Sequence, residues 1–131
     1  MIHHLYSDGG SRGNPGKAAG AFVIKKDEKI VAEGSIFLGT ATNNKAEYAG
    51  LILGLEKLSS LTKGEVRCFL DSELVVKQLK GEYRIKDEGL KPLFAKVVQL
   101  KNNFEKITFT HIRREKNKEA DFLVNKELDN N

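Results

Sequence analysis

Hydrophobic and polar positions divide the chain into segments with two different periods. Near the N-terminus, three β-like runs cover residues 2–7, 20–25 and 29–38, and turn-forming residues fill positions 9–16 and 26–29 between them. Runs of this length joined by short turns predict antiparallel hairpins. From Thr42 onward, apolar residues recur at helical spacing instead, which predicts a change from strand to helix.

The first predicted helix begins after one of three possible N-caps, Thr42, Asn43 and Asn44, and ends near Ser60. The later segments alternate between strand-like and helical patterns: in chain order, a strand over 65–70, a short helix from a Ser72 cap to about Lys80, a helix over 93–100, a strand over 107–111 and a last helix after the favourable N-cap residue Asn117. The order βββαβααβα predicts an α/β fold in which helices cover a mixed sheet.

Length and composition indicate one globular domain. The chain has 131 residues, so residues 1–131 are predicted to form a single domain, and 40% apolar with 31% charged residues is ordinary for a folded protein. We expect no membrane association, because the apolar stretches fall far short of the roughly 20 residues that span a bilayer. We also expect a cytoplasmic protein, because the single cysteine, Cys68, excludes an internal disulfide and no secretory signal is recognisable.

The balance of charges is slightly basic. Lys and Arg outnumber Asp and Glu by 22 to 18, which gives a net charge of +4 and a pI near 9.1. This balance favours a polyanionic partner such as a nucleic acid, although a solvated lysine-rich surface produces the same numbers. Charge alone therefore does not decide the function.

Four acidic residues lie next to the apolar segments that are predicted to form the core, although they cannot contribute to hydrophobic packing. Asp8 and Asp71 each directly follow an apolar run, so we predict them at the C-terminal ends of strands, where open α/β sheets bind ligands. Glu47 and Asp121 are predicted in the first turns of two helices. Each position also has an ordinary explanation, because an aspartate after a strand can begin a turn or cap a helix, and an acid in a first helical turn interacts favourably with the helix dipole.

A compact α/β fold allows these four carboxylates to meet at one edge of the sheet. Two unit charges about 4 Å apart repel by about 4 kcal/mol at an effective dielectric constant near 20, so such a cluster must take up protons or bind cations. Oxygen-rich acidic sites suit Mg²⁺ or Mn²⁺, and two such ions can hold the attacking and leaving oxygens of a phosphoryl displacement. The spacing permits this convergence but does not demonstrate it.

Four short motifs occur in series along the chain. They are Tyr-Ser-Asp-Gly-Gly-Ser at 6–11 with Gly-Asn-Pro-Gly at 13–16, Thr-Asn-Asn-Lys-Ala-Glu at 42–47, Asp-Ser at 71–72, and the segment 117–121. In these motifs, their order and their spacing, the chain resembles the type 1 ribonuclease H family over nearly its whole length. The resemblance implies a ribonuclease H-like fold, with a five-stranded mixed sheet of three antiparallel and two parallel strands flanked by helices.

The resemblance also implies a function. The family's four metal-binding acids match Asp8, Glu47, Asp71 and Asp121, of which Asp8 and Asp71 hold the metal ions most directly. The implied cofactor is a pair of Mg²⁺ ions, with Mn²⁺ as the alternative, and the implied reaction hydrolyses the RNA strand of an RNA/DNA hybrid to leave 5′-phosphate and 3′-hydroxyl ends. Double-stranded RNA is a second candidate partner.

Substrate contacts are implied within the same motifs. The matching positions are Gly9, Gly10, Ser11, Asn14, Thr42, Asn43 and Asn44. The asparagines match contacts to bases or sugars, the threonine matches a contact to the DNA backbone, and the Gly-Gly-Ser segment is expected to let the protein backbone approach the RNA strand, because glycine has no Cβ. The Gly-Asn-Pro-Gly segment is also an ordinary turn sequence.

The chain departs from the family's pattern in two places. Many members carry a histidine in a loop before the last aspartate, whereas here Arg114 or Glu115 occupies that place and His111 falls too early. We therefore assign an auxiliary catalytic role to Arg114 and a structural role to His111. The segment 81–92 is short and lacks the basic helical protrusion of some members, which predicts weaker and more salt-sensitive binding of the hybrid.

Three hypotheses about function result. The first is an endoribonuclease acting on RNA/DNA hybrids. The second is a non-catalytic module that binds hybrid or double-stranded RNA on the same fold, because fold does not fix function, although the intact set of acids argues against it. The third is the nuclease domain of a retroelement or transposition machine, which the polar ending of the chain at 129–131 makes the less favoured hypothesis. We expect a monomer.

Overall fold

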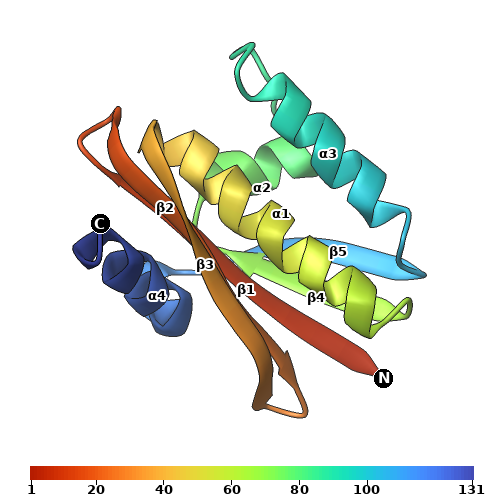
Figure 1. The fold of residues 1–131 in the computed structure, drawn as a ribbon. Coiled ribbons are helices and arrows are strands. Elements are labelled where there is room, and N and C mark those ends of the chain that lie inside the picture. Colours follow the sequence, from red (N-terminus) through yellow and green to blue (C-terminus); the bar gives the residue numbers. More distant parts are fainter.

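The computed structural model describes all 131 residues and contains a five-stranded sheet with helices on both faces (Figure 1). In chain order the elements are β1 (Ile2–Arg12), β2 (Gly16–Lys26), β3 (Lys29–Ala41), α1 (Asn43–Leu61), β4 (Glu65–Leu70), α2 (Glu73–Leu79), α3 (Lys91–Lys101), β5 (Lys106–His111), the 3₁₀ turn η1 (Arg114–Lys116) and α4 (Lys118–Asp129). The predicted order βββαβααβα is confirmed, with η1 as an addition before the last helix.

The sheet has the strand order β3-β2-β1-β4-β5. β1, β2 and β3 pair in antiparallel fashion, and β4 and β5 extend the sheet in parallel with β1, as predicted. The parallel ladder between β1 and β4 ends with Ser7 opposite Leu70, whereas the antiparallel ladder between β1 and β2 continues to Arg12 opposite Lys17. β1 is therefore paired on both sides from His4 to Ser7, and on one side only from Asp8 to Arg12.

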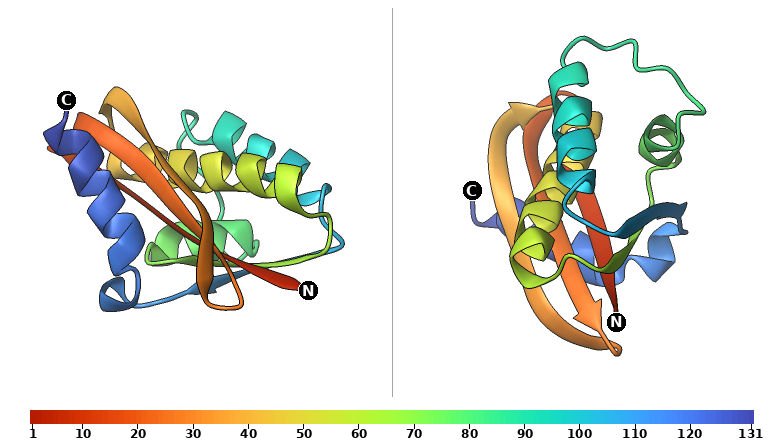
Figure 2. Two further views of the ribbon diagram at one scale, coloured as in Figure 1. Left: turned by 60° about the horizontal axis from the view of Figure 1, so that its bottom comes forward. Right: turned by 90° about the vertical axis from the view of Figure 1, so that its right-hand side faces the viewer.

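Apolar side chains form two cores on opposite faces of the sheet. The larger core contains 18 buried residues and includes Leu51, Leu55 and Leu58 of α1 together with residues of α2, α3 and four of the strands. The smaller core joins Ala19 and Ala21 of β2 to Val124 and Leu128 of α4. Figure 2 shows α3 alongside α1, while α4 lies apart from both (Figure 1). No helix is both long and apolar enough to cross a membrane.

The first hairpin differs from its prediction. β1 was expected to end at Ser7 and residues 9–16 to form a turn, but both strands continue and only the residues around Asn14 lie outside them. Glycines in this segment were interpreted as turn residues, whereas the structure places Gly9 and Gly10 within a paired strand. β3 is likewise longer than expected and ends at Ala41.

The helix boundaries are closer to their predictions. Thr42 is the N-cap of α1 and Ser72 that of α2, and each side chain accepts a hydrogen bond from a backbone N–H in the first turn. Pro92 lies in the first turn of α3, where its missing N–H has no intrahelical partner to lose. Residues 81–90 contain no helix, which confirms the predicted lack of a helical protrusion.

Candidate active site

Two aspartates lie side by side where the parallel part of the sheet ends. Ser7 and Leu70 are the last paired residues of β1 and β4, so Asp8 and Asp71 follow at adjacent positions of neighbouring strands. The prediction that Asp8 ends its strand is wrong, because β1 continues along β2 for four more residues, to Arg12. Asp8 is 6% exposed and held in mid-strand, and Asp71 follows β4 directly.

Glu47 reaches these aspartates because α1 approaches the sheet closely. A Cβ on Gly50 would lie 2.4 Å from the carbonyl oxygen of Asp8, and a Cβ on Gly9 would lie 2.1 Å from the carbonyl carbon of Ala46. Any side chain at either glycine would force α1 and β1 apart. Glu47 lies in the second turn of α1, not the first as predicted, because the earliest possible cap is the one used.

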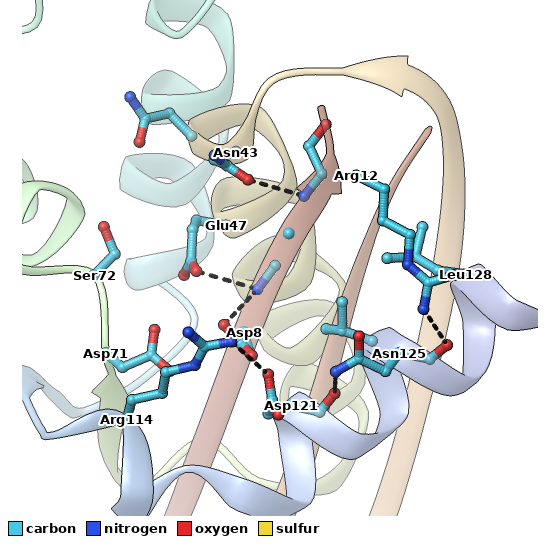
Figure 3. A pocket seen from close by; sticks show the side chains of 15 residues that line it. Asp8, Arg12, Asn43, Glu47, Asp71, Ser72, Arg114, Asp121, Asn125 and Leu128 are labelled. Atoms are coloured by element: carbon cyan, nitrogen blue, oxygen red, sulfur yellow. Dashed lines mark hydrogen bonds and ion pairs between the residues drawn. The ribbon is translucent and has the colours of Figure 1, made fainter. Parts of the chain in front are cut away.

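Carboxylate oxygens of Asp8, Glu47 and Asp71 all lie within 4.8 Å of one another (Figure 3). The N–H of Gly9 donates to Asp8 Oδ1 at 2.9 Å and to Glu47 Oε1 at 3.2 Å. The second oxygen of Glu47, Oε2, is buried without a hydrogen-bond partner. A buried, unpartnered carboxylate oxygen beside two further carboxylates fits a hard divalent cation, which prefers oxygen ligands.

Burial and repulsion change the protonation of the two buried acids. Burial, followed by repulsion from Asp71, raises the pKa of Asp8 from 3.8 to about 7. The pKa of Glu47 also lies well above its usual value, first because of burial and then because of the charge on Asp8. Without a cation these two side chains therefore retain protons at pH values where carboxyls are normally ionised. Cation binding favours the ionised forms.

Asp121 lies at the rim of this cluster. It is in the first turn of α4, as predicted, and its charge makes a small contribution to the raised pKa of Asp8. Its Oδ1 lies 3.7 Å from a guanidinium nitrogen of Arg114, whose side chain is 80% exposed. An exposed ion pair of this kind contributes little to stability, so Arg114 can exchange Asp121 for another anion at low cost.

The four acids line one open pocket of about 350 Å³. Of the residues matched to substrate contacts, those that also line it are Gly9, Gly10, Ser11, Asn43 and Asn44. The missing side chain of Gly9 is explained by α1, whereas a Cβ on Gly10 would meet only Val124, at an ordinary 3.7 Å. Gly10 is therefore the position where a missing side chain widens the pocket.

Asn14 and Thr42 do not line the pocket but support its wall. The Oδ1 of Asn14 accepts a hydrogen bond from the N–H of Asn43 at 3.0 Å, and the Oδ1 of Asn43 accepts one from the N–H of Ser11 at 2.9 Å. Thr42 caps α1 by accepting from the N–H of Lys45. The first hairpin and the start of α1 are thereby joined into one wall.

Two residues near the end of β5 take different positions. His111 lies outside the pocket lining, and its Nδ1 is 4.0 Å from a carboxylate oxygen of Glu73 on α2. Asn117 was interpreted as an N-cap, but its side chain makes no capping bond and instead donates to the carbonyl of Ser7 and to Asp71. Its position four residues before Asp121 was the only signal in the sequence, and a cap explains that position equally well.

Known proteins share this sequence pattern. A family described as "Reverse transcriptase-like" matches residues 6–127. Ribonuclease HI of Halobacterium salinarum is 42% identical over 127 residues, which cover 96% of this chain and 64% of that protein. A bifunctional protein of Mycobacterium tuberculosis is 41% identical over 127 residues, which cover 95% of this chain and 35% of that protein. The chain thus spans less than two thirds of the length of both relatives.

Solved structures are similar over almost the entire chain. RNase H1 from Halobacterium salinarum matches with a TM-score of 0.95 at 40% identity and covers 100% of both chains. LC11-RNase H1, solved in complex with an RNA/DNA hybrid, matches with a TM-score of 0.93 at 41% identity and covers 98% of this chain and 97% of that chain. The predicted α/β ribonuclease H-like fold is confirmed, and the chain belongs to the type 1 ribonuclease H family.

Proposed function

We propose that this protein is an endoribonuclease that hydrolyses the RNA strand of RNA/DNA hybrids and leaves 5′-phosphate and 3′-hydroxyl ends. The observation that carries the proposal is the convergence of Asp8, Glu47 and Asp71 within 4.8 Å. Three carboxylates so close together repel one another and repel a phosphate backbone, so a protein that only binds nucleic acid has no use for them. The similarity to a family member solved with a bound hybrid supports the same substrate.

The four acids are proposed to hold two divalent cations, Mg²⁺ or Mn²⁺, with Asp8 and Asp71 as the most direct ligands and Glu47 and Asp121 completing the sites. When bound, such ions supply the positive charge that activates water and stabilises the departing 3′ oxygen. The N–H of Gly9 holds the carboxylates of Asp8 and Glu47 in fixed orientations. Both side chains are only 6% exposed, so the surrounding protein limits the directions in which their carboxylates can point.

The wall of the pocket is proposed to bind the hybrid. Asn43 and Asn44 line the pocket, and the Oδ1 of Asn43 is already bonded to Ser11, which leaves its NH₂ group to donate to a base or sugar. Gly10 provides room for the RNA strand beside the acids. Arg114 is proposed to assist by exchanging Asp121 for a phosphate of the substrate or product, because its guanidinium is exposed and only loosely paired.

The proposal is tested by digesting labelled RNA/DNA hybrid, double-stranded RNA and double-stranded DNA side by side, with and without Mg²⁺. We expect magnesium-dependent cleavage of the RNA in the hybrid, and its loss in Asp8→Asn and Asp71→Asn. Asn103→Ala is a matched control, because Asn103 bonds to Ser59 far from the acids. Unchanged cleavage by the two aspartate variants would rule out the proposed site.

The alternative is a non-catalytic module that binds hybrid or double-stranded RNA. This alternative predicts that the protein binds hybrid and double-stranded RNA but cleaves neither of them, with or without metal. The same digestion therefore separates the two functions. A single domain over residues 1–131, a monomeric state and a cytoplasmic location are further proposals, the last supported by the free, buried Cys68.

The short connection between α2 and α3 is proposed to weaken binding of the hybrid. Without a basic protrusion, fewer phosphates are neutralised by the protein, so affinity is expected to be lower and to fall at lower salt concentrations than in family members that have one. Titration of the hybrid across a salt series, with inactive Asp8→Asn protein, measures this. If this protein and a family member with the basic protrusion bound the hybrid with equal affinity across the series, the proposal would be contradicted.

A further inference from the structure

Asn117 connects the three elements that carry Asp8, Asp71 and Asp121. Its Nδ2 donates to the carbonyl oxygen of Ser7 at 2.8 Å and to Asp71 Oδ2 at 3.2 Å. Its own carbonyl oxygen accepts a hydrogen bond from the N–H of Asp121 at 3.1 Å. Asn117 thus contacts one acid directly, is bonded to the residue before the second, and begins the helix that carries the third.

The orientation of this amide is fixed by its partners. The Ser7 carbonyl and the Asp71 carboxylate both accept hydrogen bonds, so only the NH₂ group of Asn117 can face them. The side chain is 2% exposed, and its Oδ1 is buried without a hydrogen-bond partner. Leaving a buried acceptor unpaired is unfavourable, so the arrangement is dictated by the two bonds that the NH₂ group makes.

Helix capping does not explain the residue. An asparagine at the N-cap normally stabilises a helix by accepting a hydrogen bond from a backbone N–H of the first turn. Asn117 occupies the N-cap position of α4 but makes no such bond. The side chain instead donates hydrogen bonds to the carboxylate of Asp71 and to the backbone of β1, although a capping bond would stabilise the start of α4.

We propose that Asn117 is a positioning residue that fixes the Asp71 carboxylate, and the start of α4, relative to Asp8 in the metal site. The inference rests on the proposed function. Without the amide, the carboxylate of Asp71 can rotate away from Asp8 and Glu47, and α4 loses its bond to Ser7. Loss of a hydrogen-bond partner behind a metal ligand typically lowers metal affinity by about 10- to 100-fold.

The experiment compares Asn117→Ser with wild-type protein. Serine can still cap α4 through its hydroxyl but is too short to reach both Ser7 and Asp71. Metal binding is measured on substrate-free protein by calorimetric titration with Mn²⁺ and Mg²⁺, and by the increase in Tm that each ion produces. We expect metal affinity to fall by about 10-fold or more. Cleavage of the hybrid is expected to need correspondingly more Mg²⁺, with KM for the hybrid unchanged.

Ser35→Ala is the matched control. Its hydroxyl donates to Glu127 at 2.7 Å and so attaches the same helix, α4, to β3 away from the acids. This variant is expected to lose some stability and to bind metal like the wild type. A general loosening of α4 would instead weaken metal binding in both variants and would overturn the inference.

The remaining outcomes are also decisive. If Asn117→Ser is less stable but binds metal with wild-type affinity, the residue is structural only. If Asn117→Ser does not fold, Asn117→Gln carries the test, because it keeps the amide but displaces it by one methylene; wild-type metal affinity in that variant would contradict positioning. Failure of the wild type to bind metal or cleave hybrid would refute the proposed function itself, which is a separate result.

Discussion

Two faces of helix α1 pack in different ways. Leu51, Leu55 and Leu58 lie in the 18-residue core, where side chains fill the space between the helices and the sheet. On the face toward β1 and β2, Gly50 and Gly54 replace large side chains, and at Gly50 the helix backbone touches the strand backbone. The leucine face provides most of the apolar burial, whereas the glycine face determines how far Glu47 lies from Asp8.

The two faces of α1 differ in how their contacts respond to a substitution. A core of side chains absorbs a change of volume by partial rearrangement, and the change appears as lost stability. Two backbones in contact cannot rearrange without moving the elements to which they belong. Substitutions on the leucine face should therefore affect stability without affecting the acid cluster, and a substitution at Gly50 should affect both.

Gly50→Ala is expected to have the largest effect. The new Cβ would lie 2.4 Å from the carbonyl oxygen of Asp8 and 2.9 Å from backbone atoms of Ala21, so α1 must move away from the sheet. Such overpacking costs about 3 kcal/mol of unfolding free energy. A shift of about 1 Å in a catalytic group can lower the rate by about 100-fold, so kcat for hybrid cleavage should fall by that order in the folded protein.

Denaturant unfolding and single-turnover cleavage at a temperature where the variant is fully folded measure these two quantities. Normal cleavage by a destabilised Gly50→Ala protein would show that the glycine contact does not set the position of Glu47.

Leu55→Ala should destabilise the protein to a similar extent without the catalytic loss. Leu55 is fully buried in the larger core, and leucine-to-alanine changes at such sites cost about 3 kcal/mol. Because no backbone contact is altered, kcat per folded molecule should remain close to that of the wild type. A loss of kcat comparable to that of Gly50→Ala would mean that the two faces of α1 are not independent.

Asp8→Asn is expected to stabilise the metal-free protein in a pH-dependent manner. The pKa of Asp8 is about 7 in the folded protein and 3.8 as its ordinary value, so its protonated form stabilises the fold fully below about pH 4, and this contribution is lost as the pH rises through about 7. Asparagine carries no charge at any pH. Near pH 8 without metal, the variant should therefore melt several degrees above the wild type.

The advantage of Asp8→Asn should vanish near pH 4, and at pH 8 saturating Mg²⁺ should reverse it by stabilising the wild type alone. Melting curves at the two pH values, with and without Mg²⁺, provide the measurement. If the wild type were more stable than the variant at pH 8 without metal, the ionised carboxylate of Asp8 would not destabilise the fold, and the interpretation of its raised pKa would be contradicted.

Gly54→Ala should have the smallest effect and serves as the counterpart of Gly50→Ala one turn further along α1. Its new Cβ would lie 2.6 Å from Cδ1 of Leu5 and 3.0 Å from Cβ of Phe22, so the Leu5 side chain must rotate and the helix must move by a few tenths of an ångström, at some cost in packing. Alanine favours the helix by about 1 kcal/mol over glycine, which offsets this cost. We expect a change in unfolding free energy of less than about 1 kcal/mol and unchanged cleavage; a loss as large as that of Gly50→Ala would erase the distinction between backbone and side-chain contacts.

The sequence was sufficient to predict the elements and their order, because apolar periodicity and caps such as Thr42 and Ser72 are local signals. It failed where the explanation is tertiary. Gly9 was interpreted as part of a turn, although its small size is required by helix α1, because a Cβ at this position would lie 2.1 Å from the carbonyl carbon of Ala46. Strand length in the first hairpin was underestimated for the same reason.

The candidate site was predicted by type and position, but its geometry was not predictable. Burial alone distinguishes Glu47 from an ordinary helical acid, and burial depends on how closely α1 approaches β1. Asn117 looked like a helix cap because capping and carboxylate positioning place an asparagine at the same point of the chain. Only the direction of the side chain separates these interpretations.

Because β1 continues beyond Asp8, the backbone of this residue becomes ordered when the protein folds and not when a metal ion binds. Hydrogen bonds to β2 hold the backbone on both sides of this residue, so its conformational freedom is already lost when the protein folds. A ligand on a mobile loop would have to be ordered with every binding event. Here, what remains to be overcome is the desolvation of the incoming cation and the displacement of protons, so metal affinity should depend on pH more than on loop dynamics.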